Sequence, residues 1–524
     1  MPVQPGFFPR HSRRRDVLAV LGAAAWAARA STASAQNATP QAIVQGTLGE
    51  GQRFEPGLLL NIARVLARRP YVAPASDLPD VFANLTYEQY VGIKALPNAT
   101  VWAGENRGFT VEPLHRGFVF NTPVTLFTIE DGLVRRVAYD RSRFEFGRLN
   151  VPATVGDVGF SGFRLNSTYG DGQLSEFAIV QGATFFRALA RGQNFGVVAR
   201  ALTLRPAESR GEEVPLFRAF WIERPTPGVN QIVLHALIDS ESTTGVVRMT
   251  LRPGEITISD VEMTLIPRAN LDHVGFGGMA ATYLFGPNDR RGVDDARPAV
   301  YEATGLQMHN GQGEWLWRPL ANPETLQISA FLDKDPRGFG LLQRDRDFGT
   351  FHDDEQHFER RPSLWTVPLG EWGEGAVQLI EIPSESEVND NILAYWRPRA
   401  SIPVGTEFAL AYRQFWCWAV PERPPLAVVT GTRVGRGNGG RRRRFFVDFT
   451  GEGLNGGLPA DLKPLLNIAP GSAQNPKLFP HPDRKTVRVA FDLDPGTENA
   501  SELRLALEGG GKIISETWLY RWTP

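Results

Sequence analysis

From about residue 100 onward, the chain consists of short apolar or alternating runs separated by Gly, Pro, Asn and Asp. A two-residue period bounded by turn residues is typical of antiparallel strands that bury one face. The pattern predicts an all-β protein whose first part, up to about residue 395, is a large antiparallel β-sandwich. Examples of such runs are Phe118–Phe120, Val124–Ile129, Gln231–Ile238, Val246–Leu251, Glu255–Ile266, Gln327–Phe331, Val377–Ile382 and Leu393–Trp396.

Helical periodicity is strongest near the start of the chain, over Phe54–Arg68. Pro56 suits the first turn of a helix, and Pro70 prevents its continuation. The segment Leu85–Lys94 is expected to add a second short helix. The residues that share the apolar face of the first helix are Leu58, Ile62, Val65 and Leu66.

The segment Arg397–Val404 contains two prolines and few large apolar residues, which suggests a linker. Six strand candidates follow it, and their number and spacing indicate a small immunoglobulin-like sandwich. We therefore expect two domains, over residues 36–398 and 399–524. The six candidates are Glu407–Trp418, Leu426–Arg433, Phe445–Phe449, Thr486–Leu493, Glu502–Glu508 and Ile513–Arg521.

Residues 1–35 have the composition of a secretory signal peptide. A basic stretch precedes an apolar run, and Ala33-Ser34-Ala35 provides a small-x-small cleavage site. The pair Arg14-Arg15 resembles the twin-arginine signal, which directs folded proteins out of the cytoplasm. The apolar run Val17–Ala28 is too short to cross a bilayer core of roughly 30 Å. The mature protein is therefore expected in the bacterial periplasm.

Net charge and cysteine content limit the partners and the disulfides that the protein can have. Removing residues 1–35 takes away five arginines and one aspartate, so the net charge falls from −1 to −5. A mildly acidic protein has no field that attracts nucleic acid or an anionic membrane, so neither is expected as a partner. The single cysteine, Cys417, excludes an internal disulfide, and its flanks Phe415-Trp416 and Trp418 indicate a buried thiol in a strand.

Three local motifs are set aside. The glycines of residues 435–440 match a dinucleotide-binding pattern, but no helix follows them, so a hairpin turn is favoured. The arginines of residues 441–444 are interpreted as a solvated strand edge. His352 and His357 lie among acidic residues, but their spacing matches no zinc or calcium site. We expect no metal and no cofactor.

Aromatic and acidic residues provide the remaining chemistry. Trp315 and Trp317 alternate along one strand face beside Arg318, and Trp365 and Trp372 lie beside further charges. Sugars present apolar C–H faces and hydroxyl edges, so aromatic rings beside charged groups suit a glycan cleft. The alternative is that these tryptophans fill the core, as most tryptophans do.

Several long strings occur in the order found in one known family. They are Val158–Leu165, Glu176–Arg187, Gly211–Trp221, Leu237–Ser240, Gly313–Leu320, Gly338–Phe348, Arg361–Trp365 and Asn389–Ile392. In these strings the chain resembles the osmoregulated periplasmic glucan biosynthesis proteins of the G and D (MdoG/MdoD) type. The resemblance covers nearly the whole mature chain. The twin-arginine signal is more similar to the D branch.

This resemblance implies a fold and an activity. It implies a large N-terminal β-sandwich of the galactose-mutarotase type and a C-terminal immunoglobulin-like domain. The implied substrate is the β-1,2-linked glucose backbone of periplasmic glucans. The implied activity is that of an anomer-inverting glycoside hydrolase or transglycosylase. A non-catalytic protein that binds glucan during its assembly is the alternative.

Inverting cleavage of a glycosidic bond needs one carboxylic acid and one carboxylate base. By position, Asp390 matches the general acid of the family. Its neighbours Asn389 and Asn391 are expected to hydrogen-bond the Asp390 carboxyl group, which would tune its pKa, and to bind the sugar. Without the resemblance, Asp390 has the alternative role of a turn-forming residue.

The second carboxylate lies where the chain departs from the family. The family string Arg-Pro-Glu-Val-His-Asp-Ser-Asp-Gly-Leu becomes Arg297-Pro-Ala-Val-Tyr-Glu-Ala-Thr-Gly-Leu306 here. Glu302 therefore occupies the position of the candidate base. Tyr301 replaces the histidine and is expected to contact the sugar, and Thr304 replaces the second aspartate. Glutamate is one methylene longer than aspartate, and a displacement near 1 Å changes rates by roughly a hundredfold. The altered segment favours the binding-protein alternative, whereas Asp390 favours an enzyme.

Overall fold

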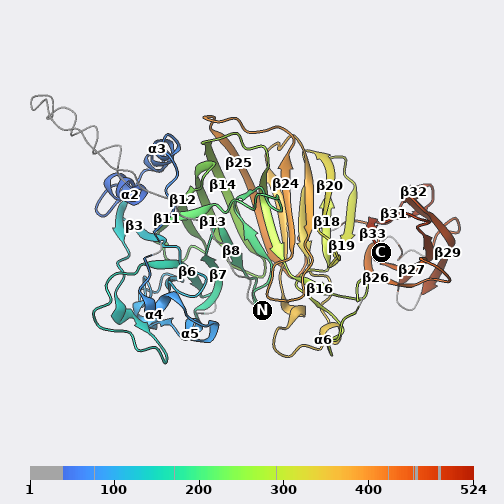
Figure 1. The fold of residues 1–524 in the computed structure, drawn as a ribbon, viewed down its shortest axis with the longest axis horizontal. Helices are drawn as coiled ribbons and strands as arrows, with labels where there is room; N and C mark the ends of the chain where they lie inside the picture. The colour runs from blue at the N-terminus through green and yellow to red at the C-terminus, as the bar shows by residue number, and fades with distance from the viewer. Residues whose placement is uncertain are drawn as a thin grey trace, which may run out of the picture.

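The computed structural model describes residues 39–75, 77–169, 172–290, 292–422, 424–451, 454, 458–481 and 485–524. The expected signal peptide lies outside these residues. Strands dominate the described chain, which confirms the all-β class (Figure 1). The described helices are too short or too polar to span a membrane. They are α2 (Pro40–Leu48), α3 (Pro56–Ala67), α4 (Asp80–Ala83), α5 (Tyr87–Val91) and α6 (Phe348–Phe351), with 3-10 turns η1 (Pro97–Ala99), η2 (Arg141–Arg143) and η3 (Phe358–Arg360).

One face of the large sandwich is a ten-stranded antiparallel sheet. Its strands follow the order β2-β6-β7-β8-β9-β15-β24-β23-β20, and β10 pairs with β15 beside this path. Their bounds are β2 (Phe109–His115), β6 (Phe160–Ser167), β7 (Ser175–Gln181), β8 (Phe185–Ala188), β9 (Val198–Arg200), β10 (Thr203–Leu204), β15 (Val274–Ala281), β20 (Gln327–Lys334), β23 (Glu374–Glu381) and β24 (Ile392–Pro398).

The second sheet has fifteen strands in the order β28-β31-β33-β19-β18-β21-β22-β25-β14-β13-β12-β11-β3-β4, with β32 beside β31. Two of its pairings are parallel, β11 with β3 and β19 with β33. The strands of its larger part are β3 (Thr125–Glu130), β4 (Leu133–Arg136), β11 (Leu216–Glu223), β12 (Ile232–Asp239), β13 (Thr243–Arg252), β14 (Thr257–Pro267), β18 (Gly305–His309), β19 (Trp315–Pro319), β21 (Gly338–Leu342), β22 (Ser363–Leu369) and β25 (Phe408–Cys417). The remaining strands are β28 (Lys463–Ala469), β31 (Ser501–Gly509), β32 (Lys512–Ile513) and β33 (Thr517–Trp522).

The two sheets pack face to face around an aromatic and aliphatic core. Phe163 of β6 meets Phe220 of β11 edge to face, with ring centroids 5.0 Å apart, so the rings join the two sheets. Phe186 of β8 and Trp416 of β25 make a similar contact at 6.1 Å. Burying one such ring contributes roughly 2–3 kcal/mol, and many of them make up this core.

Most runs expected to be strands are strands. One is not: residues 118–120 form a tight turn, in which the backbone groups of Gly117 and Phe120 exchange hydrogen bonds. Two short hairpins close loops near the sandwich. They are β1 (Lys94–Ala95) with β5 (Phe144–Glu145), and β16 (Tyr283–Phe285) with β17 (Val300–Tyr301).

The expected first helix is α3, with Pro56 as its first residue. It packs on the outer face of the fifteen-stranded sheet, where Ile62 lies in a cluster with Trp221 and Leu237. The expected apolar face is partly wrong, because Val65 is 39% exposed whereas Leu59 is buried. The buried residues of α3 are Leu59, Ile62, Ala63 and Leu66, so the face that contacts the sheet is rotated about the helix axis from the expected one, toward Leu59. The second expected helix is the shorter α5.

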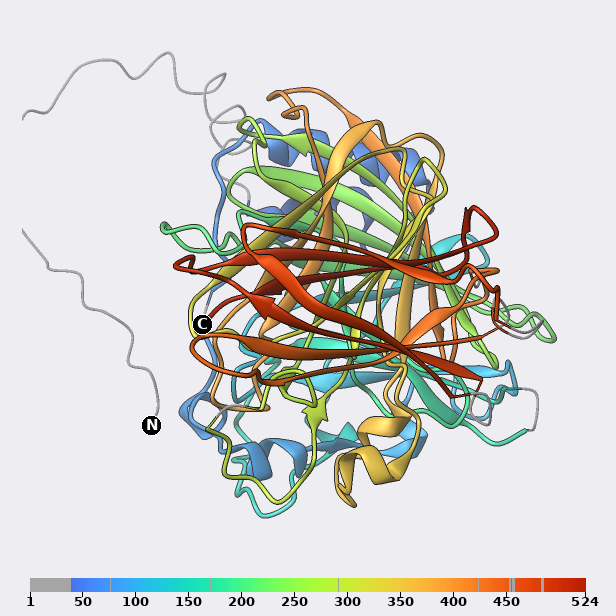
Figure 2. The same cartoon turned by 90° about the vertical axis from the view of Figure 1, so that its right-hand side faces the viewer.

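The C-terminal unit is a second two-layer β-sandwich. Its own sheet has the order β26-β27-β30-β29 and packs on β28, β31 and β33 through a separate core. Because β33 pairs with β19, the large sheet continues into this unit, whose strands cross in front of the large sandwich in Figure 2. Its remaining strands are β26 (Val428–Arg436), β27 (Arg443–Thr450), β29 (Ser472–His481) and β30 (Thr486–Asp494).

The segment Arg397–Val404, expected as a domain linker, joins β24 to β25 instead. Its backbone is held there by a bridge between Ile402 and Leu271. β25 pairs along its length with β14 and β22, so residues 408–417 belong to the large sandwich rather than to the C-terminal unit. We therefore propose that the change of unit falls after β25 and before β26.

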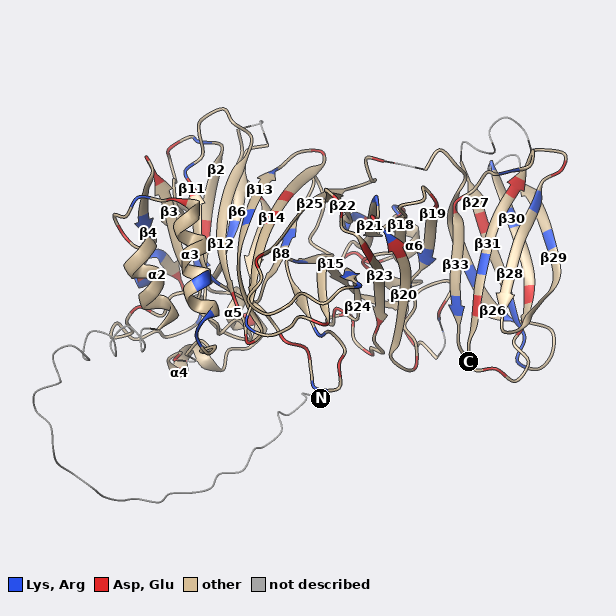
Figure 3. Cartoon of the chain, turned by 90° about the horizontal axis from the view of Figure 1, so that it is seen from above, with Lys and Arg blue, Asp and Glu red and all other residues tan. Residues whose placement is uncertain are grey.

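The glycines of residues 435–440 form the turn of the β26–β27 hairpin, as expected. The arginines that follow do not form a sheet edge, because β27 is flanked by β26 and β30. They pair with aspartates instead, as Arg444 does with Asp492 and Arg442 with Asp494. Figure 3 shows basic and acidic residues interspersed along both sandwiches. Cys417 is buried, as expected.

Candidate functional site

Thr282 joins the two acidic segments that the sequence singles out. Its backbone amide donates a hydrogen bond to Glu302 Oε2 at 3.3 Å, and its carbonyl accepts one from the Glu302 amide at 2.9 Å. Its hydroxyl donates to the carbonyl of Asn389 at 3.0 Å, directly before Asp390. Thr282 follows β15, which pairs with β24. The register of the ten-stranded sheet therefore brings together two carboxyl groups that are almost ninety residues apart in sequence.

Two arginines lie beside these carboxyl groups. Arg187 of β8 lies 3.9 Å from Asp390, and Arg361 lies 3.9 Å from Glu302. The Asp390 side chain is 32% exposed and the Glu302 side chain 13%. Burial raises the pKa of Glu302 above its usual value; Arg361 opposes this shift, and the charge of Asp390 adds to it. The Asp390 carboxylate is therefore close enough to act on the enclosed Glu302 carboxyl group.

This arrangement suits proton transfer. One carboxyl group is nearly enclosed and has a raised pKa, which is how proteins bring a glutamate base toward neutral pH. The other is open enough to meet a substrate. Arg187 and Arg361 provide donors that can hold hydroxyl oxygens in place.

Tyr301, expected to contact sugar, is buried instead. Its ring stacks on Tyr283 with centroids 5.2 Å apart, and its hydroxyl donates to Asp345 Oδ2 at 2.7 Å. Burial raises the pKa of Asp345, while the bonds from Tyr301 and Thr304 oppose the shift. Tyr301 therefore supports the backbone next to Glu302 rather than offering a ring to a ligand.

Arg297 ties together the loops around the site. Its guanidinium bonds Asp295 at 2.8 Å, Asp353 at 2.7 Å and Glu387 at 2.6 Å. These carboxylates come from three separate loops, and Glu387 belongs to the loop that carries Asp390. Arg297 therefore restricts the motion of that loop.

The C-terminal unit also contacts the segment around Asp345, which supports Tyr301. Arg344 makes a two-pronged ion pair with the buried Glu516, at 2.6 and 3.0 Å, and its guanidinium lies 3.4 Å from the centre of the Trp317 ring. Gln307 donates to the same carboxylate at 3.0 Å. Since Asp345 follows Arg344 directly, this contact holds the segment that supports Tyr301.

The two asparagines beside Asp390 have different surroundings. Asn391 is buried, accepts a hydrogen bond from the Tyr283 amide at 2.8 Å and donates to the carbonyls of Tyr283 and Ile382. We assign it to holding the start of β24. Asn389 is exposed beside Asp390, where a ligand can reach it.

One side of the sheet carries Trp315 and Trp317, as expected, and also Trp365. That side faces the core shared with the C-terminal unit. Trp315 stacks on His309 with centroids 4.0 Å apart and on Trp365 at 6.0 Å. The core-filling alternative therefore describes these three residues, and we assign them to packing rather than to substrate. Sequence alone does not show which sheet face the C-terminal unit covers.

Arg318 is enclosed in the protein, and Trp372 lies away from the acidic pair. Arg318 is buried and bonds Glu381 at 2.9 Å. Trp372 lies just before β23, and Asp390 lies just before β24. These two strands are antiparallel, and their pairing runs from Gly375 opposite Pro398 to Glu381 opposite Ile392. The two residues are therefore at opposite ends of the hairpin, about 20 Å apart along the strands.

Four residues of the site were not predicted, namely Thr282, Arg187, Arg297 and Arg361. Three of them had a signal: Arg187 ends a string that resembles the glucan biosynthesis family, and Arg297 and Arg361 each begin one. Among the described residues, no group of three or more His, Cys, Asp or Glu is placed to hold a metal ion.

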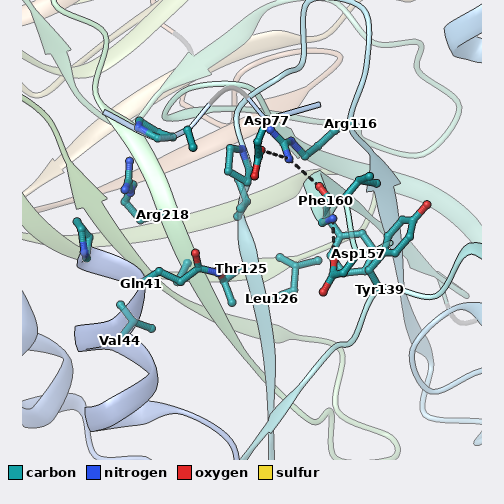
Figure 4. A pocket seen from close by; sticks show the side chains of 18 of the residues that line it. Gln41, Val44, Asp77, Arg116, Thr125, Leu126, Tyr139, Asp157, Phe160 and Arg218 are labelled. Carbon is teal, nitrogen blue, oxygen red and sulfur yellow. Dashed lines mark hydrogen bonds and ion pairs between the residues drawn. The ribbon is translucent and has the colours of Figure 1, made fainter. Parts of the chain in front are cut away.

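A pocket of about 360 Å³ lies elsewhere, between α2 and β3 (Figure 4). Arg116, which points into it, is neutralised by Asp77 at 3.1 Å and bonds the Val158 carbonyl at 2.7 Å. Arg136 pairs in the same way with Asp157 at 3.2 Å. None of the residues expected from the sequence to act in the site lines this pocket.

Known proteins similar to this chain were identified by sequence. The family model described as "Periplasmic glucan biosynthesis protein, MdoG" matches residues 54–522. The protein named glucans biosynthesis protein G from Rhodopseudomonas palustris (strain BisA53) is 42% identical over 511 residues, covering 97% of this chain and 99% of that one. Proteins of the same name from Bradyrhizobium diazoefficiens and Shewanella sp. (strain ANA-3) are 41% and 42% identical over 477 residues. They cover 91% and 90% of this chain, and 95% and 87% of their own.

Proposed function

The chain belongs to the MdoG family of periplasmic glucan biosynthesis proteins, and we propose that it acts on β-1,2-linked glucan backbones as an anomer-inverting glycoside hydrolase or transglycosylase. Glucan biosynthesis in the periplasm follows from the family. The linkage and the reaction are the proposal.

The observation that carries the proposal is the meeting of Asp390 and Glu302 at Thr282, between Arg187 and Arg361. In the proposed reaction Asp390 donates a proton toward the leaving glycosidic oxygen. Glu302 removes a proton from the attacking water or sugar hydroxyl, which adds to the opposite face of the ring. A water or a sugar hydroxyl can relay either proton if the direct distance is too long.

Incubating the purified mature protein with linear β-1,2-glucan tests this function. Shorter chains indicate hydrolysis, redistributed chain lengths indicate transfer, and early proton NMR spectra report the anomer formed. Linear β-1,4-glucan serves as the matched control and should remain intact. Cleavage of both polymers would contradict the linkage, and a retained anomer would contradict the inverting mechanism.

The pH dependence of turnover should report Glu302. A base acts only when ionised, so the rate should fall as the pH drops through the raised pKa of Glu302, above the usual range of a glutamate. Glu302→Gln should lower kcat by about 10²–10⁴-fold. Glu302→Asp, which restores the family residue, should retain far more activity than the Gln variant. An unchanged kcat in Glu302→Gln would contradict the base assignment.

Glu302→Gln should also be more stable than the parent protein at neutral pH. A carboxyl group whose pKa is raised by folding destabilises the folded state above its unfolded pKa, and the amide carries no such charge. The Tm of Glu302→Gln should therefore exceed that of the parent at pH 7, and the difference should shrink as the pH falls toward 4.5. Thermal unfolding at several pH values measures both.

A non-catalytic glucan-binding protein is the second candidate. Its support is that Tyr301 and Thr304, which replace a histidine and an aspartate of the family string, both bond internally to Asp345 or Gln343. Neither is free to assist a base. Binding of β-1,2-glucan without any turnover by the parent protein would decide for this candidate.

We also propose export by the twin-arginine route, as in the D branch of the family. Replacing Arg14 and Arg15 by Lys should leave the precursor in the cytoplasm, because the guanidinium pair itself is the recognised signal. Cell fractionation followed by immunoblotting measures the distribution. Normal periplasmic delivery of the double-Lys variant would contradict this route.

A further inference from the structure

The side chain of Asp390, the proposed acid, has few contacts of its own. It is 32% exposed, and its carboxylate accepts no hydrogen bond from the described part of the chain. Its ion-pair partner Arg187 lies 3.9 Å away. A contact this long, at a site this open to solvent, restrains a side chain only weakly. The placement of Asp390 therefore depends mainly on the backbone that carries it.

That backbone is held on both sides of Asp390. On the C-terminal side, the buried Asn391 accepts a hydrogen bond from the Tyr283 amide at 2.8 Å, at the start of β24. On the N-terminal side, the carbonyl of Asn389 accepts a hydrogen bond from the Thr282 hydroxyl at 3.0 Å. This carbonyl belongs to the same planar peptide unit as the Asp390 amide. The Thr282 hydroxyl therefore fixes the plane from which Asp390 begins.

The Thr282 side chain is itself well fixed. It is 3% exposed, and a β-branched residue has few rotamers. Its hydroxyl also lies 3.2 Å from the carbonyl of Glu387, so it contacts the backbone on both sides of Val388. The Val388 side chain is 84% exposed and adds little packing. The bend before Asp390 is therefore held at its base, by Thr282, rather than at its tip.

The two halves of Thr282 hold different carboxyl groups. Its backbone amide and carbonyl both bond Glu302, whereas its hydroxyl bonds the loop that carries Asp390. A change at the hydroxyl therefore alters the acid side of the site and leaves the base side in place. Arg297 cannot take over this role, because it binds the Glu387 carboxylate and not the peptide next to Asp390.

Building on the proposed acid role of Asp390, we propose that Thr282 is its positioning residue. The hydroxyl fixes the peptide before Asp390, so the carboxyl group is in place before the glucan binds. The buried Thr282 touches no substrate and acts only through Asp390. Fixing a reacting group in advance lowers the barrier, and a misplacement near 1 Å costs roughly a hundredfold in rate.

Thr282→Val tests the hydroxyl alone, because valine keeps the branched shape. Its kcat on linear β-1,2-glucan should fall by about tenfold to a hundredfold, because Asp390 is no longer held in place. Glucan affinity, measured by calorimetry, should change by less than about twofold. Thr282→Ser keeps the hydroxyl, and its kcat should stay within about threefold of the parent value. The fall in rate at low pH assigned to Glu302 should keep its midpoint in both variants, because the Thr282 backbone is unchanged.

A second measurement does not depend on turnover. Thermolysin cleaves before exposed aliphatic residues, so cleavage of the folded protein between Glu387 and Val388 reports how often the loop opens. Mass spectrometry of the first fragments should show this cleavage about tenfold faster in Thr282→Val and no faster in Thr282→Ser. Thr244→Val is the matched control, because it removes a similar buried bond beneath α3, from the Thr244 hydroxyl to the Ala63 carbonyl at 2.9 Å. It should change neither kcat nor this cleavage.

The possible outcomes separate the positioning role from the proposed function. Unchanged cleavage in Thr282→Val would overturn the positioning role and leave the proposed function standing, and so would faster cleavage with an unchanged kcat. A Thr282→Ser variant as slow as Thr282→Val would overturn it too, because the hydroxyl would not explain the rate. Equal loss of activity in Thr244→Val would show general destabilisation and overturn it as well. No turnover by the parent protein would overturn the proposed function, and the positioning role with it.

Discussion

Replacing Asp390 by Asn is expected to reduce the turnover of β-1,2-glucan by about 10²–10⁴-fold while glucan affinity changes little. The amide has nearly the shape of the carboxyl group, so Arg187 and the loop tied by Arg297 should stay in place. It has no acidic proton to give to the leaving oxygen. Initial rates measured at saturating glucan, with binding measured separately by calorimetry, test both halves of the prediction.

The matched control is Glu385→Gln, which removes an exposed carboxyl group from the same loop. Its turnover should equal that of the parent protein. If Asp390→Asn keeps full activity, Asp390 is not the acid, even though the family is correct. If both variants lose activity equally, the loss comes from the charge or mobility of the loop.

Replacing Arg318 by Ala should destabilise the protein by about 3–5 kcal/mol, because it leaves Glu381 buried without its cation. The two side chains are only 2% and 1% exposed, and their charges lie 2.9 Å apart. Arg318 also donates to the Pro319 carbonyl, and Glu381 accepts the Ala321 amide. Removing the guanidinium therefore breaks a connection between the ends of β19 and β23.

The pH dependence of this loss has a definite sign. Burial already raises the pKa of Glu381, with Arg318 as the main opposing influence. Without Arg318 the folded protein prefers a neutral Glu381, so the penalty is greatest above the raised pKa and shrinks as the pH falls toward 4.5. Urea unfolding at pH 7 and at pH 5 measures the difference.

A surface pair in the same hairpin provides the control. Arg399 and Glu374 lie 2.6 Å apart, but their side chains are 78% and 57% exposed. Arg399→Ala should cost less than about 1 kcal/mol. Adding Glu381→Gln to Arg318→Ala should restore part of the lost stability. A glucan-binding defect in Arg318→Ala with unchanged stability would return Arg318 to the substrate site.

The sequence alone determined the local structure where each element is set by its own residues. Pro56 and the apolar period produced α3, and the alternating runs produced strands such as β12, β13 and β14. Strands β28 and β29 were missed, because these edge strands carry many polar or exposed residues and show little apolar contrast.

The sequence also selected the two carboxyl groups, but only through the resemblance to a family. Neither Asp390 nor Glu302 has a local pattern that distinguishes it from a turn residue. Their meeting at Thr282 depends on the pairing of β15 with β24, which joins segments more than a hundred residues apart. Arg187 and Arg361 reach the site through the same long-range packing.

Only the tertiary structure decided what covers each strand face. Alternation shows that one face of β19 is apolar, but not that the C-terminal unit covers Trp315 and Trp317. Likewise, a proline-containing segment reads as a linker until the partners of β25 are known. Periodicity is a property of neighbouring residues, whereas burial and the surroundings of a charge depend on distant ones. The sequence therefore determined which residues have the chemistry, and long-range packing determined which of them can use it.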